Sequence, residues 1–124
     1  METVLVIDDS SFQRKWLAQA ISKLGFNVVQ AANGKEGLEV IAEQKPSFIT
    51  VDLNMPVMDG LQFLANLQPQ DKNIPTVVVT SDIQTETARR CKELGAFALL
   101  NKPFDAGDLQ KVIKSIEEKK GNGA

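Results

Sequence analysis

Short apolar runs recur along the chain at nearly even intervals, and this repeat constrains the fold more than any other feature. The five runs are VLVI (4–7), FNVVQA (26–31), SFITV (47–51), TVVVT (76–80) and AFALL (96–100). Several runs are apolar throughout and do not alternate with polar residues, which is typical of strands that are covered on both faces. We therefore expect these runs to form the buried strands of a parallel sheet.

The segments between the runs show helical periodicity, because their apolar residues recur at spacings of three and four. Ser10, Asp59 and Asp105 lie where helix caps are expected. We expect the periodic apolar residues, including Trp16 and Cys91, to face the core. These residues are Phe12, Trp16, Leu17, Ala20, Ile21 and Leu24; Leu38 and Ile41; Leu61, Leu64 and Leu67; Ala88, Cys91 and Leu94; and Leu109, Val112, Ile113 and Ile116.

The alternation of strand and helix predicts an α/β fold. Right-handed crossovers place helices on both faces of a parallel sheet. For a five-stranded, doubly wound sheet of the flavodoxin-like (βα)5 type we expect the strand order 2-1-3-4-5, with strands 1 and 3 at the centre. The 124 residues suit a single domain over 1–120, followed by a flexible polar tail over 121–124.

Charge and composition exclude several classes of protein. The net charge is −2 and no block of Lys and Arg stands out, so nucleic-acid binding has little electrostatic support. No apolar run approaches the roughly 18 residues of a membrane span. A single cysteine, Cys91, leaves no internal disulfide and suggests a reducing, cytoplasmic environment. The chain has no histidine, which excludes imidazole metal sites and histidine-dependent triads.

Carboxylates follow two of the central strands. Asp8 and Asp9 come directly after the first apolar run, and Asp52 comes directly after the third. Ser10 can cap the following helix, and Asp52 lies too far from the next helix to cap it, so capping does not explain these residues. Because like charges held together need a positive partner, the cluster predicts a hard divalent cation such as Mg²⁺.

Strands 4 and 5 bring further polar groups to the same edge of the sheet. The fourth run ends in Thr80 and Ser81, and the fifth ends next to Lys102. Each residue by itself is unremarkable, since a strand end often holds a threonine and a loop often holds a solvated lysine. Together they place a hydroxyl group and an ammonium group beside the carboxylates.

These motifs together resemble one family. They are DD at 8–9, Asp52 followed by xxMPxMDG, TS at 80–81, GA at 95–96 and KPF at 102–104. From about residue 3 to residue 118 the chain resembles a response-regulator receiver domain of the CheY type from two-component signalling. CheY itself has the 2-1-3-4-5 strand order.

The resemblance implies that Asp52 accepts a phosphoryl group from a sensor histidine kinase or a histidine phosphotransfer protein. It implies that Asp9, Asp52 and the backbone carbonyl of Asn54 bind Mg²⁺ or Mn²⁺, and that Asp8 holds the metal through water. The activity would be Mg²⁺-dependent self-phosphorylation and autodephosphorylation rather than that of a conventional turnover enzyme.

Further residues receive roles from the same resemblance. Lys102 and the Thr80 hydroxyl would contact the phosphoryl group, with help from the Ser81 backbone N–H. The bond between Lys102 and Pro103 is typically cis in this family. The side chains of Asn54 and Asp82 would flank the path of the hydrolytic water, or they are simply solvated loop residues.

The sequence departs from the family at the switch position, three residues before Lys102. Leu99 stands there in place of an aromatic residue, while Phe97 should point to the same side by the two-residue period of a strand. One interpretation is that the phosphorylation chemistry is intact and the conformational readout is altered. The alternative is a receiver-like interaction module whose output does not depend on phosphorylation.

We expect a stand-alone receiver that acts by binding a downstream protein through the face of helix 4, strand 5 and helix 5, as in chemotaxis-type regulators. A monomer is expected, with a phosphorylation-linked dimer as an open alternative. A flavodoxin is disfavoured because DDSSFQ would repel a flavin phosphate, and an Asp-nucleophile phosphatase is disfavoured because its DxD pattern is absent.

Overall fold

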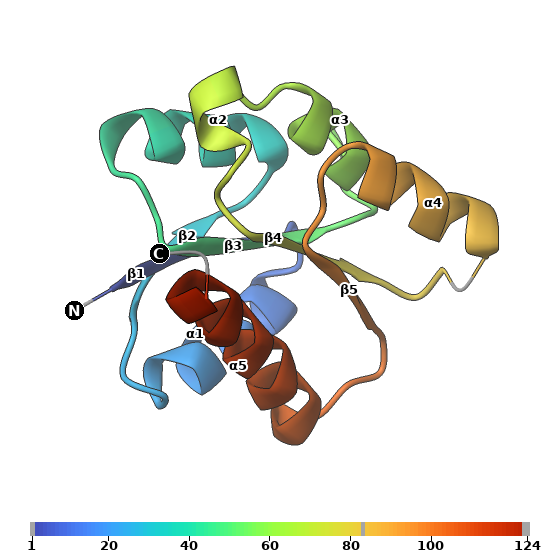
Figure 1. Ribbon diagram of the computed structural model, residues 1–124. Helices are drawn as coiled ribbons and strands as arrows, with labels where there is room; N and C mark the ends of the chain where they lie inside the picture. Colours follow the sequence, from blue (N-terminus) through green and yellow to red (C-terminus); the bar gives the residue numbers. More distant parts are fainter. Residues whose placement is uncertain (1, 83, 123–124) are drawn as a thin grey trace.

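The computed structural model describes residues 2–82 and 84–122, and it confirms the predicted fold (Figure 1). The five strands form one parallel sheet in the order β2-β1-β3-β4-β5. The strands are β1 (Thr3–Ile7), β2 (Asn27–Ala31), β3 (Phe48–Asp52), β4 (Thr76–Thr80) and β5 (Ala98–Asn101).

Helices α1 and α5 cover one face of the sheet, and α2, α3 and α4 cover the other (Figure 1). The helices are α1 (Ser11–Ser22), α2 (Gly34–Glu43), α3 (Gly60–Ala65), α4 (Thr85–Glu93) and α5 (Ala106–Asn122), with a short 3-10 helix at Pro69–Asp71. The predicted caps are confirmed. Ser10 accepts a hydrogen bond from Gln13 N, and Asp59 accepts one from Gln62 N. Asp105 accepts one from Asp108 N.

The core consists of two apolar layers, one on each face of the sheet. Val4 and Val6 of β1 face the α1 and α5 side, whereas Leu5 and Ile7 face the α2, α3 and α4 side. All four side chains are fully buried, which explains why β1 is a continuous apolar run. Cys91 lies in the layer beneath α4 and is buried, as predicted.

The predicted core face of α1 is partly wrong. The residues of α1 that are buried against the sheet are Leu17, Ala18 and Ile21. Phe12 is 82% exposed, and Trp16 and Leu24 are each 39% exposed. Phe12 lies in the first turn of the helix and borders a surface hollow together with Trp16 and Phe104. Trp16 packs edge-on against Phe104 with ring centres 5.6 Å apart. The apolar residues of α1 therefore cover a wider face of the helix than the face that packs against the sheet.

The tail predicted over 121–124 overlaps the end of α5, which extends to Asn122, and residues 123 and 124 lie outside the described residues. Across residues 2–82 and 84–122, no helix combines the length and the apolar character needed to cross a membrane.

Candidate functional site

The register of the central strands brings the three predicted carboxylates together. Ile7 of β1 lies beside Val51 of β3, so Asp8 and Asp52, the next residue of each strand segment, emerge side by side. One carboxylate oxygen from each of Asp8, Asp9 and Asp52 lies within 4.8 Å of the others. Asp8 and Asp52 are buried, whereas Asp9 is exposed at the rim. The predicted acidic cluster therefore exists.

Asp8 is the most enclosed of these carboxylates, with only 1% of the residue exposed. Its Oδ1 accepts a hydrogen bond from Ser10 N at 2.9 Å, but its Oδ2 has no hydrogen-bond partner among the described residues. Burial raises the pKa of Asp8 to about 6, and the negative charges of Asp52 and Asp9 add to the increase. The Ser10 N–H and the charge of Lys102 act in the opposite direction.

Lys102 supplies the positive charge next to the cluster. Its Nζ lies 3.2 Å from Oδ2 of Asp52, which is only 6% exposed. The lysine is held there by β5, because Asn101 pairs with Thr80 and the Lys102 N–H donates to the Thr80 carbonyl at 2.8 Å. The bond between Lys102 and Pro103 is cis, as predicted.

The donor set suits a hard divalent cation. Magnesium prefers carboxylate oxygens and retains several waters, so it needs only a few protein ligands. The unpaired Oδ2 of Asp8 is a buried acceptor without a donor, and the remaining negative charge exceeds what one lysine neutralises. Asp8, Asp9 and Asp52 therefore fit Mg²⁺ or Mn²⁺.

The loop between β3 and α3 closes over the end of β3. The Gly60 N–H donates to the Leu53 carbonyl at 2.8 Å, and a Cβ atom at Gly60 would lie 2.9 Å from the Asp52 carbonyl oxygen. Asn54 lies in this loop and is exposed. Val57 has a positive φ of 69°, a conformation that β-branched residues rarely adopt. The loop is thus tightly folded directly beside Asp52.

Thr80 is buried at the end of β4, and its Oγ1 accepts a hydrogen bond from the Asp82 backbone N–H at 2.9 Å. The Asp82 carboxylate is turned toward α4, where it accepts hydrogen bonds from Thr87 Oγ1 at 2.6 Å and Gln84 N at 2.8 Å. These hydrogen bonds, the Thr87 one foremost, lower the pKa of Asp82. Ser81 is exposed next to Thr80.

The prediction that Phe97 and Leu99 share a side is wrong. Leu99 packs against the layer beneath α4, whereas Phe97 packs against the layer on the α1 and α5 side. The Lys119 ammonium of α5 lies 5.3 Å from the centre of the Phe97 ring. The two-residue period does not extend to Phe97 because β5 begins only at Ala98.

Sequence reasoning missed Arg14. One guanidinium nitrogen of this α1 residue donates to the Asp8 carbonyl at 2.7 Å, and its Nε donates to Gln30 of β2 at 3.2 Å. Arg14 therefore connects the end of β1 to β2 next to the acidic cluster. Its sequence signal is weak, since an arginine on the polar face of a helix is usually a solvated charge.

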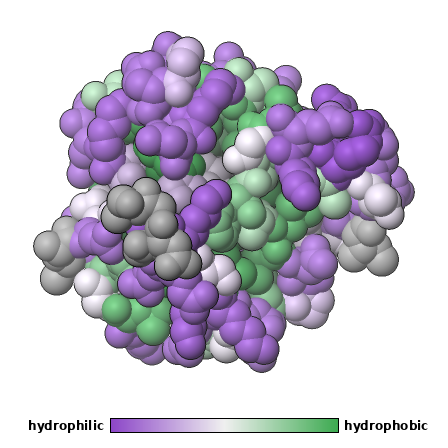
Figure 2. Space-filling view, in the orientation of Figure 1, coloured by the Kyte–Doolittle hydropathy of each residue, from purple (hydrophilic) through white to green (hydrophobic). Residues whose placement is uncertain are grey.

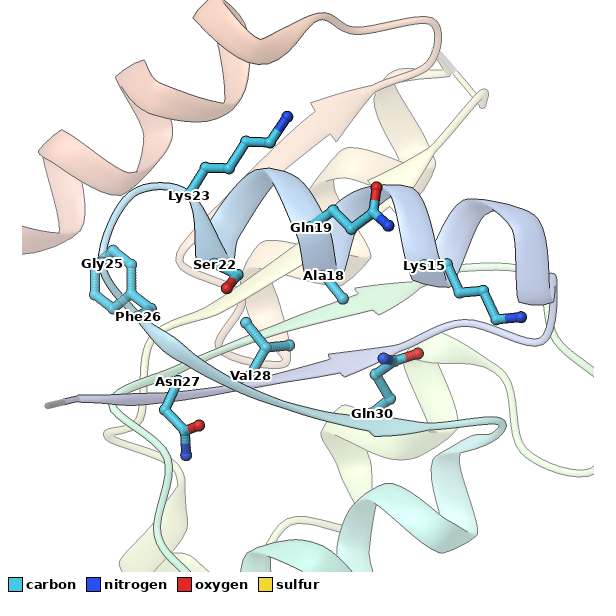
Figure 3. Close-up of a pocket in the computed structure, with 10 residues that line it drawn as sticks. All are labelled: Lys15, Ala18, Gln19, Ser22, Lys23, Gly25, Phe26, Asn27, Val28 and Gln30. Atoms are coloured by element: carbon cyan, nitrogen blue, oxygen red, sulfur yellow. The ribbon is translucent and has the colours of Figure 1, made fainter.

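A separate hollow of about 600 Å³ lies between α1 and the edge strand β2 (Figure 3). Polar side chains from both elements border it, among them Gln19, Ser22, Asn27 and Gln30. None of the predicted site residues lines it. It contributes no reactive group to the carboxylate cluster.

Comparison with known proteins identifies the family. The family described as "Response regulator receiver domain" matches residues 4–114. The chain is a response-regulator receiver domain. Receiver domains are phosphoacceptor switches of two-component signalling rather than conventional enzymes; histidine kinases phosphorylate them, and they bind Mg²⁺ at an acidic pocket.

Relatives of this receiver come from several pathways. The chain is 31% identical to sporulation initiation phosphotransferase F of Bacillus subtilis, covering 98% of both chains. It is 31% identical to a probable chemotaxis protein CheY of Rhizobium etli, covering 91% of this chain and 90% of that protein. Among longer relatives, it spans 52% of the transcriptional regulatory protein PrrA of Mycobacterium tuberculosis at 32% identity.

Solved structures agree with the fold. Chemotaxis protein CheY4 of Vibrio cholerae superimposes with a TM-score of 0.88 at 32% identity, over 94% of this chain and 98% of that one. A response regulator receiver domain protein of Clostridium thermocellum superimposes with a TM-score of 0.90 at 25% identity over the full length of both chains.

Proposed function

We propose that this receiver accepts a phosphoryl group on Asp52 from the phosphohistidine of a sensor kinase or a histidine phosphotransfer protein. The observation that supports this most strongly is the position of Asp52. Its carboxylate lies at the end of β3 among the carboxylates of Asp8 and Asp9, with the Lys102 ammonium 3.2 Å from Oδ2. Such an arrangement presents a nucleophile together with charges suited to a phosphoryl group.

In the proposed step, an Asp52 carboxylate oxygen forms a bond to phosphorus while the bond between phosphorus and the donor imidazole nitrogen breaks. The electron pair of that bond returns to the imidazole, and Asp52 becomes an acyl phosphate. Lys102 offsets the negative charge that arrives with the phosphoryl oxygens. Thr80 Oγ1 accepts from Asp82 N, so its own hydroxyl proton is available to donate to a phosphoryl oxygen.

Asp9, Asp52 and the backbone carbonyl of Asn54 would hold Mg²⁺ directly in this proposal, and Asp8 would hold it through water. A bound Mg²⁺ supplies positive charge that stabilises the phosphoryl oxygens in the transition state. The Ser81 backbone N–H is a further proposed donor to the phosphoryl group.

Hydrolysis of the acyl phosphate needs a positioned water. Asn54 is exposed in the loop beside Asp52, which is compatible with a role in orienting that water. The Asp82 carboxylate already accepts hydrogen bonds from Gln84 N and Thr87 Oγ1. We therefore propose that its main role is to stabilise the start of α4, and that orienting the hydrolytic water is a secondary role.

The signal is proposed to leave through the face formed by α4, β5 and α5. If Thr80 Oγ1 turns toward a phosphoryl group, the Asp82 N–H loses its acceptor and the start of α4 is disturbed. Leu99 packs beneath α4 without an aromatic ring, so we propose that the chemistry is retained while this readout is altered. We expect the protein to act in the cytoplasm as a monomer, with dimerisation on phosphorylation as the alternative.

Intact mass after incubation with acetyl phosphate tests this proposal. We expect one added phosphoryl group in Mg²⁺, none in EDTA, and none in Asp52→Asn. Asp59→Asn is the matched control, because Asp59 caps α3 outside the cluster and asparagine also caps helices. If Asp52→Asn were phosphorylated as well as the native protein, the assignment of Asp52 would be wrong. If the native protein gains no mass, a beryllofluoride titration separates rapid hydrolysis from an inactive site.

A further inference from the structure

A cleft of about 730 Å³ lies at the N-terminal ends of β4 and β5, whereas the carboxylates lie at the C-terminal ends of the strands. It is bordered by the segment 72–75 before β4, the end of α4 and the last turns of α5. Figure 2 shows an apolar area between α5 and α4 that is flanked by hydrophilic residues. None of the residues assigned to phosphorylation lines this cleft.

The charge of the cleft is entirely positive. Four lysines line it, and no carboxylate side chain among the described residues does; the lysines are Lys72, Lys92, Lys119 and Lys120. The whole chain has a net charge of −2, so this surplus is local. Three cations outside the cleft, by contrast, have carboxylate partners: Lys45 pairs with Asp71, Arg89 with Glu86 and Glu93, and Lys102 with Asp52.

Within the cleft, ion pairing is weak. Lys120 lies 3.9 Å from Glu2, and no other lysine of the cleft forms an ion pair with a residue in the described part of the chain. Like charges gathered in this way raise the local potential and attract anions. The cleft thus has the electrostatics of a site for a multiply charged anion.

Contacts with the protein position several of the ammonium groups. Lys119 Nζ lies over the Phe97 ring at 5.3 Å, and Lys120 Nζ donates to the Ser47 carbonyl at 2.9 Å. Lys72 Nζ is 3.5 Å from the Leu64 carbonyl oxygen. Because these side chains are partly ordered before a ligand arrives, less entropy is lost when they bind an anion.

The lining between the lysines is apolar. Ile74 and Pro75 come from the segment before β4, Ala96 and Phe97 from the segment before β5, and Ile116 from α5. Inorganic phosphate would use the charge of this cleft but not its apolar surface, and the volume is in the range of small-molecule sites. A ligand that fits both features has phosphate groups joined to a flat, largely apolar ring system.

We propose that this cleft binds a nucleotide, with its phosphates on Lys92 and Lys119 and its base against Ile74 and Pro75. This site is independent of phosphorylation at Asp52. A nuclear magnetic resonance titration with ATP, in EDTA to keep metal-bound phosphate away from the carboxylates, tests it directly. We expect saturable 1:1 binding with the largest amide shifts at Ile74, Ala96 and Phe97.

The double substitution Lys92→Gln/Lys119→Gln should weaken ATP binding by about tenfold or more, since each loses a charge-assisted contact. Lys35→Gln/Lys114→Gln is the matched control, because it removes the same charge from exposed residues that do not line the cleft. Asp52→Asn should bind ATP as the native protein does.

Several results would overturn the proposal. Absence of saturation at about 1 mM ATP would mean that the cleft has no useful affinity for nucleotides. An equal loss in both double variants would indicate general charge attraction. Tripolyphosphate binding as tightly as ATP would show that the apolar lining contributes nothing, and shifts centred on Asp52 would place the ligand at the other end of the sheet.

Discussion

Lys102 Nζ lies 3.2 Å from Asp52 Oδ2, although the two residues are 50 positions apart in the chain. The contact depends on β4, which pairs with β3 on one side and with β5 on the other. The sheet thereby brings a lysine that directly follows its edge strand β5 to the last residue of its central strand β3. This ion pair is the main internal counter-charge of the acidic cluster.

Replacing this lysine should separate two effects of its charge. In Lys102→Met we expect Mg²⁺ affinity to rise about three- to tenfold, because a cation that competes for Asp52 is gone. Phosphorylation by acetyl phosphate should slow by about tenfold or more, because the phosphoryl oxygens lose a partner. Calorimetry and intact mass measure the two effects, with Lys35→Met as the control. An unchanged Mg²⁺ affinity would contradict the neutralising role of Lys102.

Asp8→Asn should stabilise the metal-free protein at neutral pH. The pKa of Asp8 is about 6 in the folded protein, against an ordinary value of 3.8, so the folded state binds this proton more tightly than the unfolded state. As the pH rises from about 4 to about 6, the wild type therefore loses stability that the variant does not lose.

Urea unfolding in EDTA at a series of pH values measures this difference. We expect the free energy of unfolding of Asp8→Asn to exceed that of the wild type by about 1–2 kcal/mol at pH 7. The advantage should disappear below about pH 4, where Asp8 is protonated in both states. A difference that stays constant with pH would show that the carboxylate charge is not its cause.

Gly60→Ala should destabilise the fold beside Asp52. A Cβ atom there would lie 2.9 Å from both the Asp52 carbonyl oxygen and Leu53 Cα, and backbone atoms cannot easily move. A loss of about 2 kcal/mol is expected in thermal or urea unfolding. In the control Gly107→Ala the new Cβ would come within 3.2 Å of Asp105 Oδ1, the capping oxygen of α5, but would not meet the backbone of another segment, so its loss of stability should be smaller than that of Gly60→Ala.

Val57→Gly should stabilise the protein by about 0.5–1 kcal/mol. Val57 has a φ of 69° and is 76% exposed, so glycine relieves the backbone conformation and loses little packing. Val57→Ala keeps a Cβ atom and should recover less. If both variants were equally stable, relief of the positive φ would not be the explanation.

Removing the Asp82 carboxylate should loosen the start of α4. In Asp82→Ala we expect amide hydrogen exchange in the first turn of α4 to accelerate several-fold, because Gln84 N and Thr87 Oγ1 lose their acceptor. The lowered pKa of Asp82 means that this stabilisation is present at neutral pH and is lost as the pH falls through that pKa. Glu39→Ala on α2 should leave exchange in α4 unchanged, and acceleration there too would argue for a general loss of stability.

The site was predictable because its residues follow buried strands whose parallel order brings their carboxyl ends to one edge. Asp8, Asp9 and Asp52 form the expected cluster, and Lys102 lies beside it. Arg14 was not predictable in the same way, since its contact with the Asp8 carbonyl depends on the reach of a long side chain from α1.

Periodicity failed where an element ended or was only partly covered. Phe97 lies just before β5 and turns to the α5 side, and Phe12 lies on the turn of α1 that the sheet does not cover. In both cases the pattern of residue types was regular, but the boundary of the element decided which surface each side chain faced.

The sequence by itself determined the family, the strand order and the residues of the carboxylate cluster, because these follow from residue types at the ends of buried strands. The tertiary structure alone decided the unpaired Oδ2 of Asp8, the engagement of Asp82 by α4 and the opposite faces of Phe97 and Leu99. It also brought the lysines of three separate segments to one cleft. These features depend on contacts between distant parts of the chain, which local periodicity does not encode.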